Sequence, residues 1–260
     1  MLNAWLSLPT VGLCAGLAVP YGLIVIAIWW ITHHSPLRAR VQTLNGIVAP
    51  FFGSVAILFG LLTGFLANDI SNRAREAGRA LVVESEGLYA VQALSIASPS
   101  DMKNIRATLR AYAQSVLKDE WPKMVDEGRS NKTEAAYAGL LREISDPAVA
   151  RDAGQAVQSA ILGAVARIGN ARSDRLALSA DSTGHYKWIT VFILAMITQI
   201  SIGLVHLDKP RAQLAALTVF STAVVVAFTL IAMQEQPFAG VVQVSPLPIQ
   251  EFLDPNPPES

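Results

Sequence analysis

Charged and amide side chains gather where one long uncharged stretch of the chain ends. The stretch from Val41 to Asn68 carries no formal charge, and Asp69 follows it directly. If this helix lines a pore in a ring of identical subunits, Asp69 beside Asn68 would give a ring of carboxylates that favours cations, whereas Arg73 and Arg75, about one helical turn further on, would favour anions. The ion selectivity of such a site stays open. The alternative is that these residues only anchor a helix at a membrane interface.

Apolar side chains recur on one face of the same stretch. Phe51, Val55 and Phe59 lie at i, i+4 and i+8, so a helix would place them one above another. In a ring of subunits they would form stacked apolar constrictions, which can gate an ion path by excluding water. The alternative is that this stripe faces lipid or packs on a neighbouring helix.

Small residues line another face of that helix. Small faces let membrane helices approach closely, so the pattern predicts either a contact between subunits or ordinary packing within one subunit. The set comprises Ala49, Gly53, Ala56, Gly60, Thr63 and Ala67, at intervals of three or four residues, with Gly64 four residues after Gly60.

Glu84 follows Leu81 by three residues, at a position where a helical repeat of apolar residues would place another apolar side chain. The charged region between the second and third apolar stretches should begin and end with a helix. If these two helices are antiparallel and leave the membrane near residues 68 and 184, Glu84 and Arg167 lie at the same distance from the membrane. Glu76 then lies at the level of Arg175 or Arg172. We therefore expect interhelical ion pairs among these residues, with a regulatory ion site as the alternative.

The sequence gives little support for metal binding, enzyme activity or nucleic-acid binding. The four histidines, His33, His34, His185 and His206, stand at no metal-ligand spacing with a carboxylate or thiol. Phosphate-binding loops, dinucleotide fingerprints, zinc-protease motifs and nucleophile elbows are missing, so no enzyme activity, cofactor or metal is predicted. With 20 basic and 20 acidic residues the chain lacks the basic surplus that nucleic acid requires.

Four uncharged stretches are each long enough to cross a bilayer as a helix. A spanning helix needs about 20 apolar residues, and the expected spans are residues 11–32, 45–67, 188–207 and 214–233. Hydrophobic residues make up 52% of the chain. The sequence therefore predicts an all-helical integral membrane protein with four transmembrane helices surrounded by the lipid bilayer.

The charged residues concentrate between the second and third spans. Of the 40 formally charged residues, 31 lie between Asp69 and Lys187. Apolar residues there recur at intervals of three and four, which is typical of a helical bundle. Because no proline occurs between Pro50 and Pro99, we expect the second span to continue into this bundle as one helix, to about Ala97.

The remaining boundaries follow from turn residues. Asp146 and Pro147 should begin a long helix that runs to about Ala180. The expected domains are transmembrane helices one and two in residues 1–67, a soluble helical bundle in 68–184, transmembrane helices three and four in 185–234, and an extended or disordered tail in 235–260. Basic residues near the membrane favour the bundle side by six to four, which predicts a cell inner membrane protein with bundle and both termini cytoplasmic.

Short motifs give the chain a family resemblance. Glu120-Trp121-Pro122, Arg172-x-x-Arg175-Leu176 and Pro237-Phe238-x-Gly240, within the four-span layout, resemble the bestrophin-like family of bacterial and plant membrane proteins. The resemblance implies kinship with bestrophins, which are pentameric anion channels whose second membrane helix lines an apolar neck. The calcium-binding acidic cluster of animal bestrophins has no counterpart here, so calcium gating is not implied.

Two functions from different classes remain. The first is a homo-oligomeric ion channel, with a pentamer as the family precedent, in which the second span lines a pore for inorganic ions. The second is a non-conducting membrane scaffold or sensor whose bundle binds a cytosolic partner. A channel needs spans packed around a common axis, whereas a scaffold should expose a large patch on the bundle.

Overall fold

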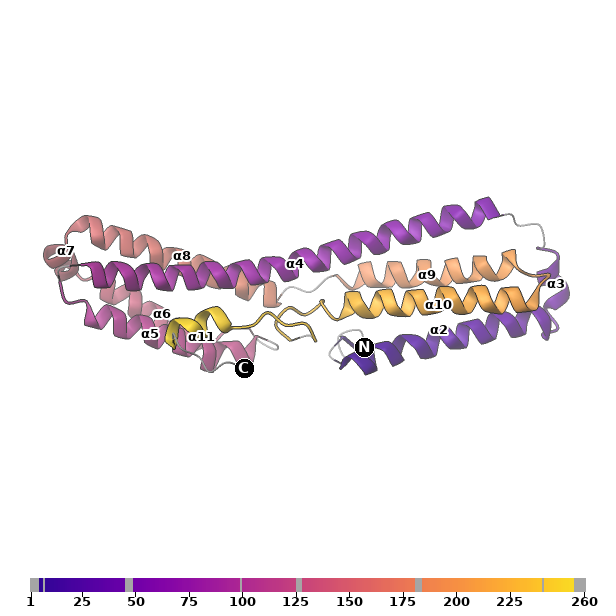
Figure 1. The fold of residues 1–260 in the computed structure, drawn as a ribbon, viewed down its shortest axis with the longest axis horizontal. Helices are drawn as coiled ribbons and strands as arrows, with labels where there is room; N and C mark the ends of the chain where they lie inside the picture. Colours follow the sequence, from indigo (N-terminus) through magenta and orange to yellow (C-terminus); the bar gives the residue numbers. More distant parts are fainter. Residues whose placement is uncertain are drawn as a thin grey trace. The chain divides into compact units, whose positions relative to one another are not determined.

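The computed structural model describes residues 5–6, 8–44, 49–98, 100–124, 128–180, 184–239 and 241–254. Within these ranges every regular element is a helix, which confirms the all-helical prediction (Figure 1). The chain divides into two units. We call residues 1–72, 182–236 and 240–242 the span unit, and residues 73–181, 237–239 and 243–260 the bundle unit.

The span unit contains four long apolar helices, each sufficient in length and composition to cross a membrane. They are α2 (Thr10–His33), the first part of α4 (Ala49–Ala97), α9 (His185–Val205) and α10 (Pro210–Ala232), with the short α3 (Arg38–Gln42) after α2 (Figure 1). The result confirms the four predicted transmembrane helices.

Aromatic packing forms the centre of the span unit. Trp188 of α9 and Phe228 of α10 are fully buried, and Leu66 and Ile70 of α4 join the same cluster as Leu13 of α2. The outward surface is also apolar, as the exposure of Val11 (80%) and Ile57 (72%) among others shows. Apolar residues on both the inside and the outside of a helix group are expected where lipid replaces water.

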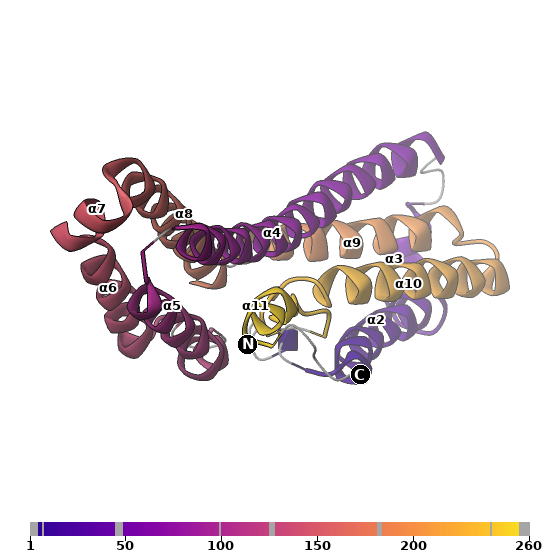
Figure 2. The ribbon, with the colours of Figure 1, turned by 60° about the vertical axis from the view of Figure 1, so that its left-hand side comes forward.

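The bundle unit consists of helices packed around one core. It holds the second part of α4, α5 (Lys103–Ser115), α6 (Asn131–Ile144), α7 (Pro147–Ala153), α8 (Gln155–Ala180) and α11 (Leu247–Leu253) (Figure 2). A π-helical turn (Val116–Glu120) and a 3-10 turn (Trp121–Lys123) continue α5. The core joins Leu88 and Val91 of α4 to Leu109 and Tyr112 of α5 and Ile168 of α8.

The structure tests three predictions of where helices begin and end. The second span and the first helix of the bundle are one continuous helix, α4, as predicted. The helix expected from Asp146 to Ala180 is divided at Gly154, whose φ of 92° is open to glycine and strained for other residues. Asp146 does cap α7, because its side chain accepts a hydrogen bond from the backbone N–H of Ala148 at 2.8 Å.

The C-terminal segment differs from its prediction as an extended or disordered tail. Residues Leu247–Leu253 form the helix α11, in which Ile249 and Phe252 are buried in the bundle core. The Ser85 hydroxyl of α4 donates a hydrogen bond to the Pro248 carbonyl at 3.0 Å. The short helix was missed because a seven-residue segment offers too little periodicity to detect. The proline-rich end, 255–260, lies outside the described residues.

Candidate functional site

Two arginines and two glutamates form a buried cluster in the bundle unit. Arg175 donates from Nε to Glu84 Oε2 at 2.7 Å and from Nη2 to Glu120 Oε1 at 2.8 Å. Arg172 donates from Nη2 to Glu120 Oε2 at 2.6 Å. Glu84, Glu120 and Arg175 are fully buried, and Arg172 is only 5% exposed. The two positive and two negative charges balance, which a buried ionic cluster requires.

Three helices and one π-helical turn position this cluster. Glu84 comes from α4, Arg172 and Arg175 come from α8, and Glu120 ends the turn that follows α5. The Tyr112 hydroxyl of α5 donates to Glu84 Oε1 at 2.7 Å. A π turn adds a residue to the helical repeat, so it changes the direction in which the following side chains point.

The Nη1 groups of the two arginines, at the outside of the cluster, also have hydrogen-bond acceptors. Arg172 Nη1 donates to Glu134 Oε2 of α6 at 2.8 Å, at the exposed edge of the site. Arg175 Nη1 donates to the Met124 sulfur at 2.9 Å, and its guanidinium carbon lies 5.8 Å from the centre of the Trp121 ring. Because the guanidinium groups are held on several sides, the cluster connects α4, α5, α6 and α8 with defined geometry.

The charges shift the titration of their neighbours. Burial raises the pKa of Tyr112 well above its usual value, and the negative charge of Glu84 raises it further. Burial alone would lower the pKa of Arg175, but the Glu84 and Glu120 carboxylates raise it above its ordinary value. Arg172 has a raised pKa for the same reason, chiefly through Glu120. All these shifts favour the charged arginines and the neutral tyrosine in the folded state.

The predicted partners of Glu84 and Arg175 need correction. Glu84 pairs with Arg175 rather than with Arg167, so the level expected for Glu84 was wrong by about two helical turns of α8. Glu76 and Arg167 are exposed and form no ion pair with other described residues. Both border a surface pocket between α4 and α8.

The sequence argument missed Glu120 and Tyr112 as members of the cluster. Tyr112 of α5 and Val116, the first residue of the π-helical turn, belong to one apolar stripe, and Glu120 follows Val116 by four residues. A carboxylate at a core position was the available signal, because a buried carboxylate needs a buried partner.

In the span unit, the stripe predicted to line a pore partly packs within the subunit. Phe59 is half-buried against α10, with its ring centre 5.7 Å from that of Phe220 and 6.1 Å from that of Phe228. Val55 is also half-buried. The side chains of Ala49 and Phe51 lie outside the described part of the structure.

A different face of α4 carries large exposed apolar side chains. Ile57 is 72%, Leu61 51% and Phe65 60% exposed, again at i, i+4 and i+8. At about 100° per residue, this face lies about 200° around the helix from Val55 and Phe59.

The predicted small-residue face lies between those two stripes. A Cβ built on Gly53, Gly60 or Gly64 would meet nothing within 4 Å, so space is open beside each glycine in the single subunit. Ala56, Thr63 and Ala67 are half-buried.

Asp69 lies near the end of the apolar part of α4 and is paired. Its Oδ2 accepts a hydrogen bond from Lys187 Nζ of α9 at 2.7 Å, and both side chains are partly exposed. Asn68 is exposed, and together with Asp69 and Lys187 it borders a pocket of about 410 Å³ between α4 and α9. A positive partner beside Asp69 weakens the argument that a ring of bare carboxylates selects cations.

Comparison with known proteins shows the family of the chain. A family model described as the bestrophin-like domain matches residues 19–249. The chain belongs to the bestrophin-like family. This result confirms the resemblance of the sequence motifs. A search of curated proteins finds no match.

Solved structures share the fold of this bestrophin-like chain. A variant of a bacterial bestrophin homologue from Klebsiella pneumoniae superposes with a TM-score of 0.68 at 14% identity, covering 93% of this chain and 96% of the other. A second structure of a Klebsiella pneumoniae bestrophin homologue gives 0.64 at 12% identity, with 94% and 97% covered. A structure described as a membrane protein gives 0.66 at 13% identity, with 93% and 97% covered. At these identities the likeness shows the fold, and the protein is a multi-pass membrane protein with four candidate spans.

Proposed function

We propose that the protein is a homo-oligomeric channel for inorganic ions, in which α4 lines the pore. The carrying observation is the stripe of Ile57, Leu61 and Phe65, which the subunit's own helices leave exposed. Membership of the bestrophin-like family and the fold of the bacterial bestrophin homologues support this use of the stripe. Stacked apolar side chains can close an ion path by excluding water.

The lining face in this proposal differs from the one expected from sequence. Phe59 is already used against Phe220 and Phe228, so the exposed stripe that ends at Phe65 is the better candidate for a constriction. Gly60 and Gly64 lie beside this stripe with open space around them. In a ring, a neighbouring subunit would pack on the glycines while the apolar stripe faces the axis.

The oligomer is a ring, with five subunits as the family precedent, in the cell inner membrane. The bundle and both termini lie in the cytoplasm, as the basic residues near the spans favour. A reporter fused after Ser260 tests this side. Alkaline phosphatase activity there, without fluorescence from a cytosolic tag, would reverse the topology.

Flux measurements with two matched phenylalanine variants test the pore. Phe65→Ala should raise ion flux through proteoliposomes relative to the unchanged protein, because it widens an apolar constriction. Phe59→Ala is the control: it removes a ring that packs on α10, so it should lower thermal stability and leave the flux per folded oligomer unchanged. Chloride and potassium fluxes are measured separately.

Two outcomes would contradict the proposal. If neither the unchanged protein nor the Phe65→Ala variant conducts chloride or potassium, the non-conducting scaffold is favoured. A flux increase with Phe59→Ala and none with Phe65→Ala would return the pore to the stripe first predicted from sequence. Electron microscopy of the detergent-purified protein gives the subunit number and shows whether α4 surrounds a common axis.

A further inference from the structure

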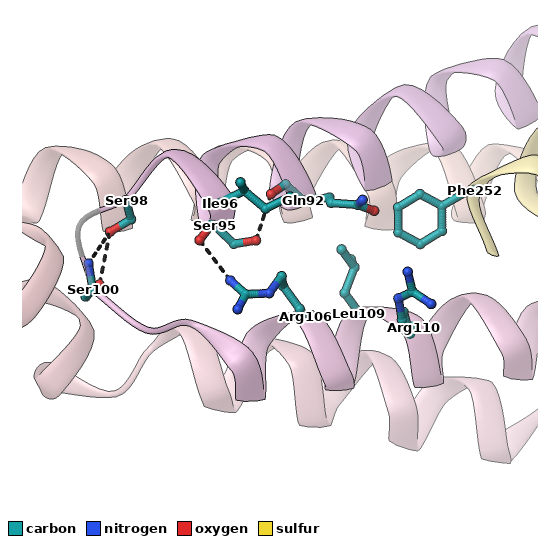
Figure 3. Close-up of a pocket in the computed structure, with 9 residues that line it drawn as sticks. All are labelled: Gln92, Ser95, Ile96, Ser98, Ser100, Arg106, Leu109, Arg110 and Phe252. Atoms are coloured by element: carbon teal, nitrogen blue, oxygen red, sulfur yellow. Dashed lines mark hydrogen bonds between the residues drawn. The ribbon is translucent and has the colours of Figure 1, made fainter. Parts of the chain in front are cut away.

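A pocket of about 420 Å³ lies in the bundle unit between the end of α4, the start of α5 and α11 (Figure 3). One side is basic, with Arg106 and Arg110 one turn apart on α5. The opposite side is apolar, with Phe252 of α11 and Ile96 of α4. The pocket therefore offers positive charge and an apolar wall to the same ligand.

The two arginines differ in how they are held. Arg106 Nη1 donates to the Ser95 carbonyl at 3.0 Å, and Nη2 lies 3.3 Å from Asp101 Oδ1. These contacts fix its direction. Arg110 is exposed and forms no hydrogen bond or ion pair with other described residues. Its guanidinium can therefore bind an anion through paired N–H donors without breaking an existing contact.

Neutral polar groups border the same space. The side-chain amide of Gln92 has no hydrogen-bond partner within the described ranges, and Figure 3 shows it extending toward the Phe252 ring while Arg110 lies below that ring. The Ser98 and Ser100 hydroxyls lie 3.0 Å apart at the far end of the pocket. An amide and a free guanidinium beside an aromatic ring suit a ligand with an oxyanion on an apolar body.

Phe252 gives this wall a fixed position. Its side chain is only 3% exposed, and its ring packs edge-on against Tyr89 of α4 at 5.3 Å between centres. Since Phe252 belongs to α11, the pocket exists only when α11 is packed on the bundle. A bound ligand would therefore favour the packed state of α11.

We propose that this pocket binds a small amphiphilic anion, a phosphate or carboxylate attached to a compact apolar group. Arg110, with Arg106 beside it, holds the oxyanion, and the apolar part contacts Ile96, which is 63% exposed, and the small exposed part of Phe252. The proposal does not depend on ion conduction. The same head group could reach the pocket on a soluble compound or on a lipid.

Calorimetric titration of the detergent-purified full chain tests the site, with phenyl phosphate as the probe. Inorganic phosphate and phenol each carry one half of the ligand and should bind more weakly than phenyl phosphate. Arg110→Gln should weaken phenyl phosphate binding about 10- to 100-fold, the effect of losing charge-assisted hydrogen bonds. Arg142→Gln on α6 makes the same charge change at an exposed position outside the pocket and should leave the affinity unchanged.

The outcomes separate the site from a general effect of charge. Absence of phenyl phosphate binding, or equal weakening by both variants, would overturn the proposal. Arg110→Lys keeps the charge but loses the paired donors, so an affinity between those of the unchanged protein and the Arg110→Gln variant supports the geometry. Dihexanoyl phosphatidic acid is titrated in parallel. Tighter binding of this lipid than of phenyl phosphate assigns the ligand to lipid head groups, and the reverse order assigns it to soluble compounds.

Discussion

The bundle unit buries Arg172 and Arg175 with two glutamates, whereas α9 and α10 of the span unit bury glutamine, serine and threonine, and a buried carboxylate, Glu235, comes only after the end of α10. Gln213 of α10 is fully buried, donates to the Gly203 carbonyl at 2.7 Å and accepts from the Thr32 hydroxyl at 3.1 Å. Gln199 of α9 is fully buried too and donates to the Ser221 hydroxyl at 2.8 Å.

The difference follows from the surroundings of each unit. A charge within a bilayer is costly even before packing begins, so neutral amides and hydroxyls connect membrane helices at a smaller cost in free energy. A helical bundle in water can bury charges if they are fully paired, and the paired geometry then defines which helices meet. The two units should therefore respond very differently when one polar partner is removed.

The largest expected effect is in the charged cluster. Glu84→Gln keeps the shape of the side chain but leaves Arg175 incompletely neutralised, and breaking a buried pair costs about 3–5 kcal/mol of unfolding free energy. Denaturant unfolding of the purified protein measures this loss. Glu134→Gln is the control, since Glu134 is 57% exposed although it also contacts a buried arginine. That control should cost at most about 1 kcal/mol.

A second substitution separates charge from packing at Glu84. Adding Arg175→Met to Glu84→Gln removes the uncompensated charge and should recover part of the lost stability. If Glu84→Gln and Glu134→Gln cost the same, the cluster does not behave as a buried ionic site.

Tyr112 should give an intermediate effect with a defined pH dependence. Its raised pKa means that its proton stabilises the folded state below about pH 10 and that this contribution is lost as the pH rises further. Tyr112→Phe should remove this dependence, and it should cost about 1–3 kcal/mol at neutral pH because Glu84 loses a buried donor.

Phenolate absorbance checks the titration of Tyr112 directly. The spectrum of the unchanged protein minus that of Tyr112→Phe should show no phenolate at pH values where an ordinary tyrosine ionises, and should show it once the protein unfolds. A difference spectrum with an ordinary tyrosine midpoint in the folded protein would contradict the burial of this hydroxyl.

The smallest expected effect is in the span unit. Gln213→Leu removes neutral hydrogen bonds between α2, α9 and α10, and such bonds contribute about 0.6–2 kcal/mol in membranes. Unfolding by SDS in mixed micelles measures the change. Thr222→Val removes an exposed hydroxyl that bonds only within α10, so it should have no effect. A cost for Gln213→Leu equal to that of Glu84→Gln would remove the contrast between the units.

The sequence predicted the parts of the fold that depend on composition and periodicity. Four uncharged stretches identified the spans, and the missing prolines between Pro50 and Pro99 identified the continuous α4. Register was harder, because the level of Glu84 was counted along the last bundle helix as though it continued to residue 184, whereas α8 ends at Ala180 and α9 begins at His185. For that reason Glu84 was matched with Arg167 instead of Arg175.

The exposed face of α4 shows a second limit of sequence reasoning. Phe59 and Phe65 both continue apolar repeats of four, so periodicity alone does not say which one the subunit covers. Only the position of α10 decides, because Phe220 and Phe228 meet Phe59 and leave Phe65 exposed.

The packing of α11 also constrains how the chain is made. Ile249 and Phe252 complete a core whose other buried members come from residues 81–168. A ribosome that has translated the whole of α8 still lacks these two side chains until α9 and α10 have been synthesised. The bundle unit therefore reaches its final core only after the last span has emerged, and a nascent chain stopped before Leu247 would present an apolar gap to chaperones and proteases.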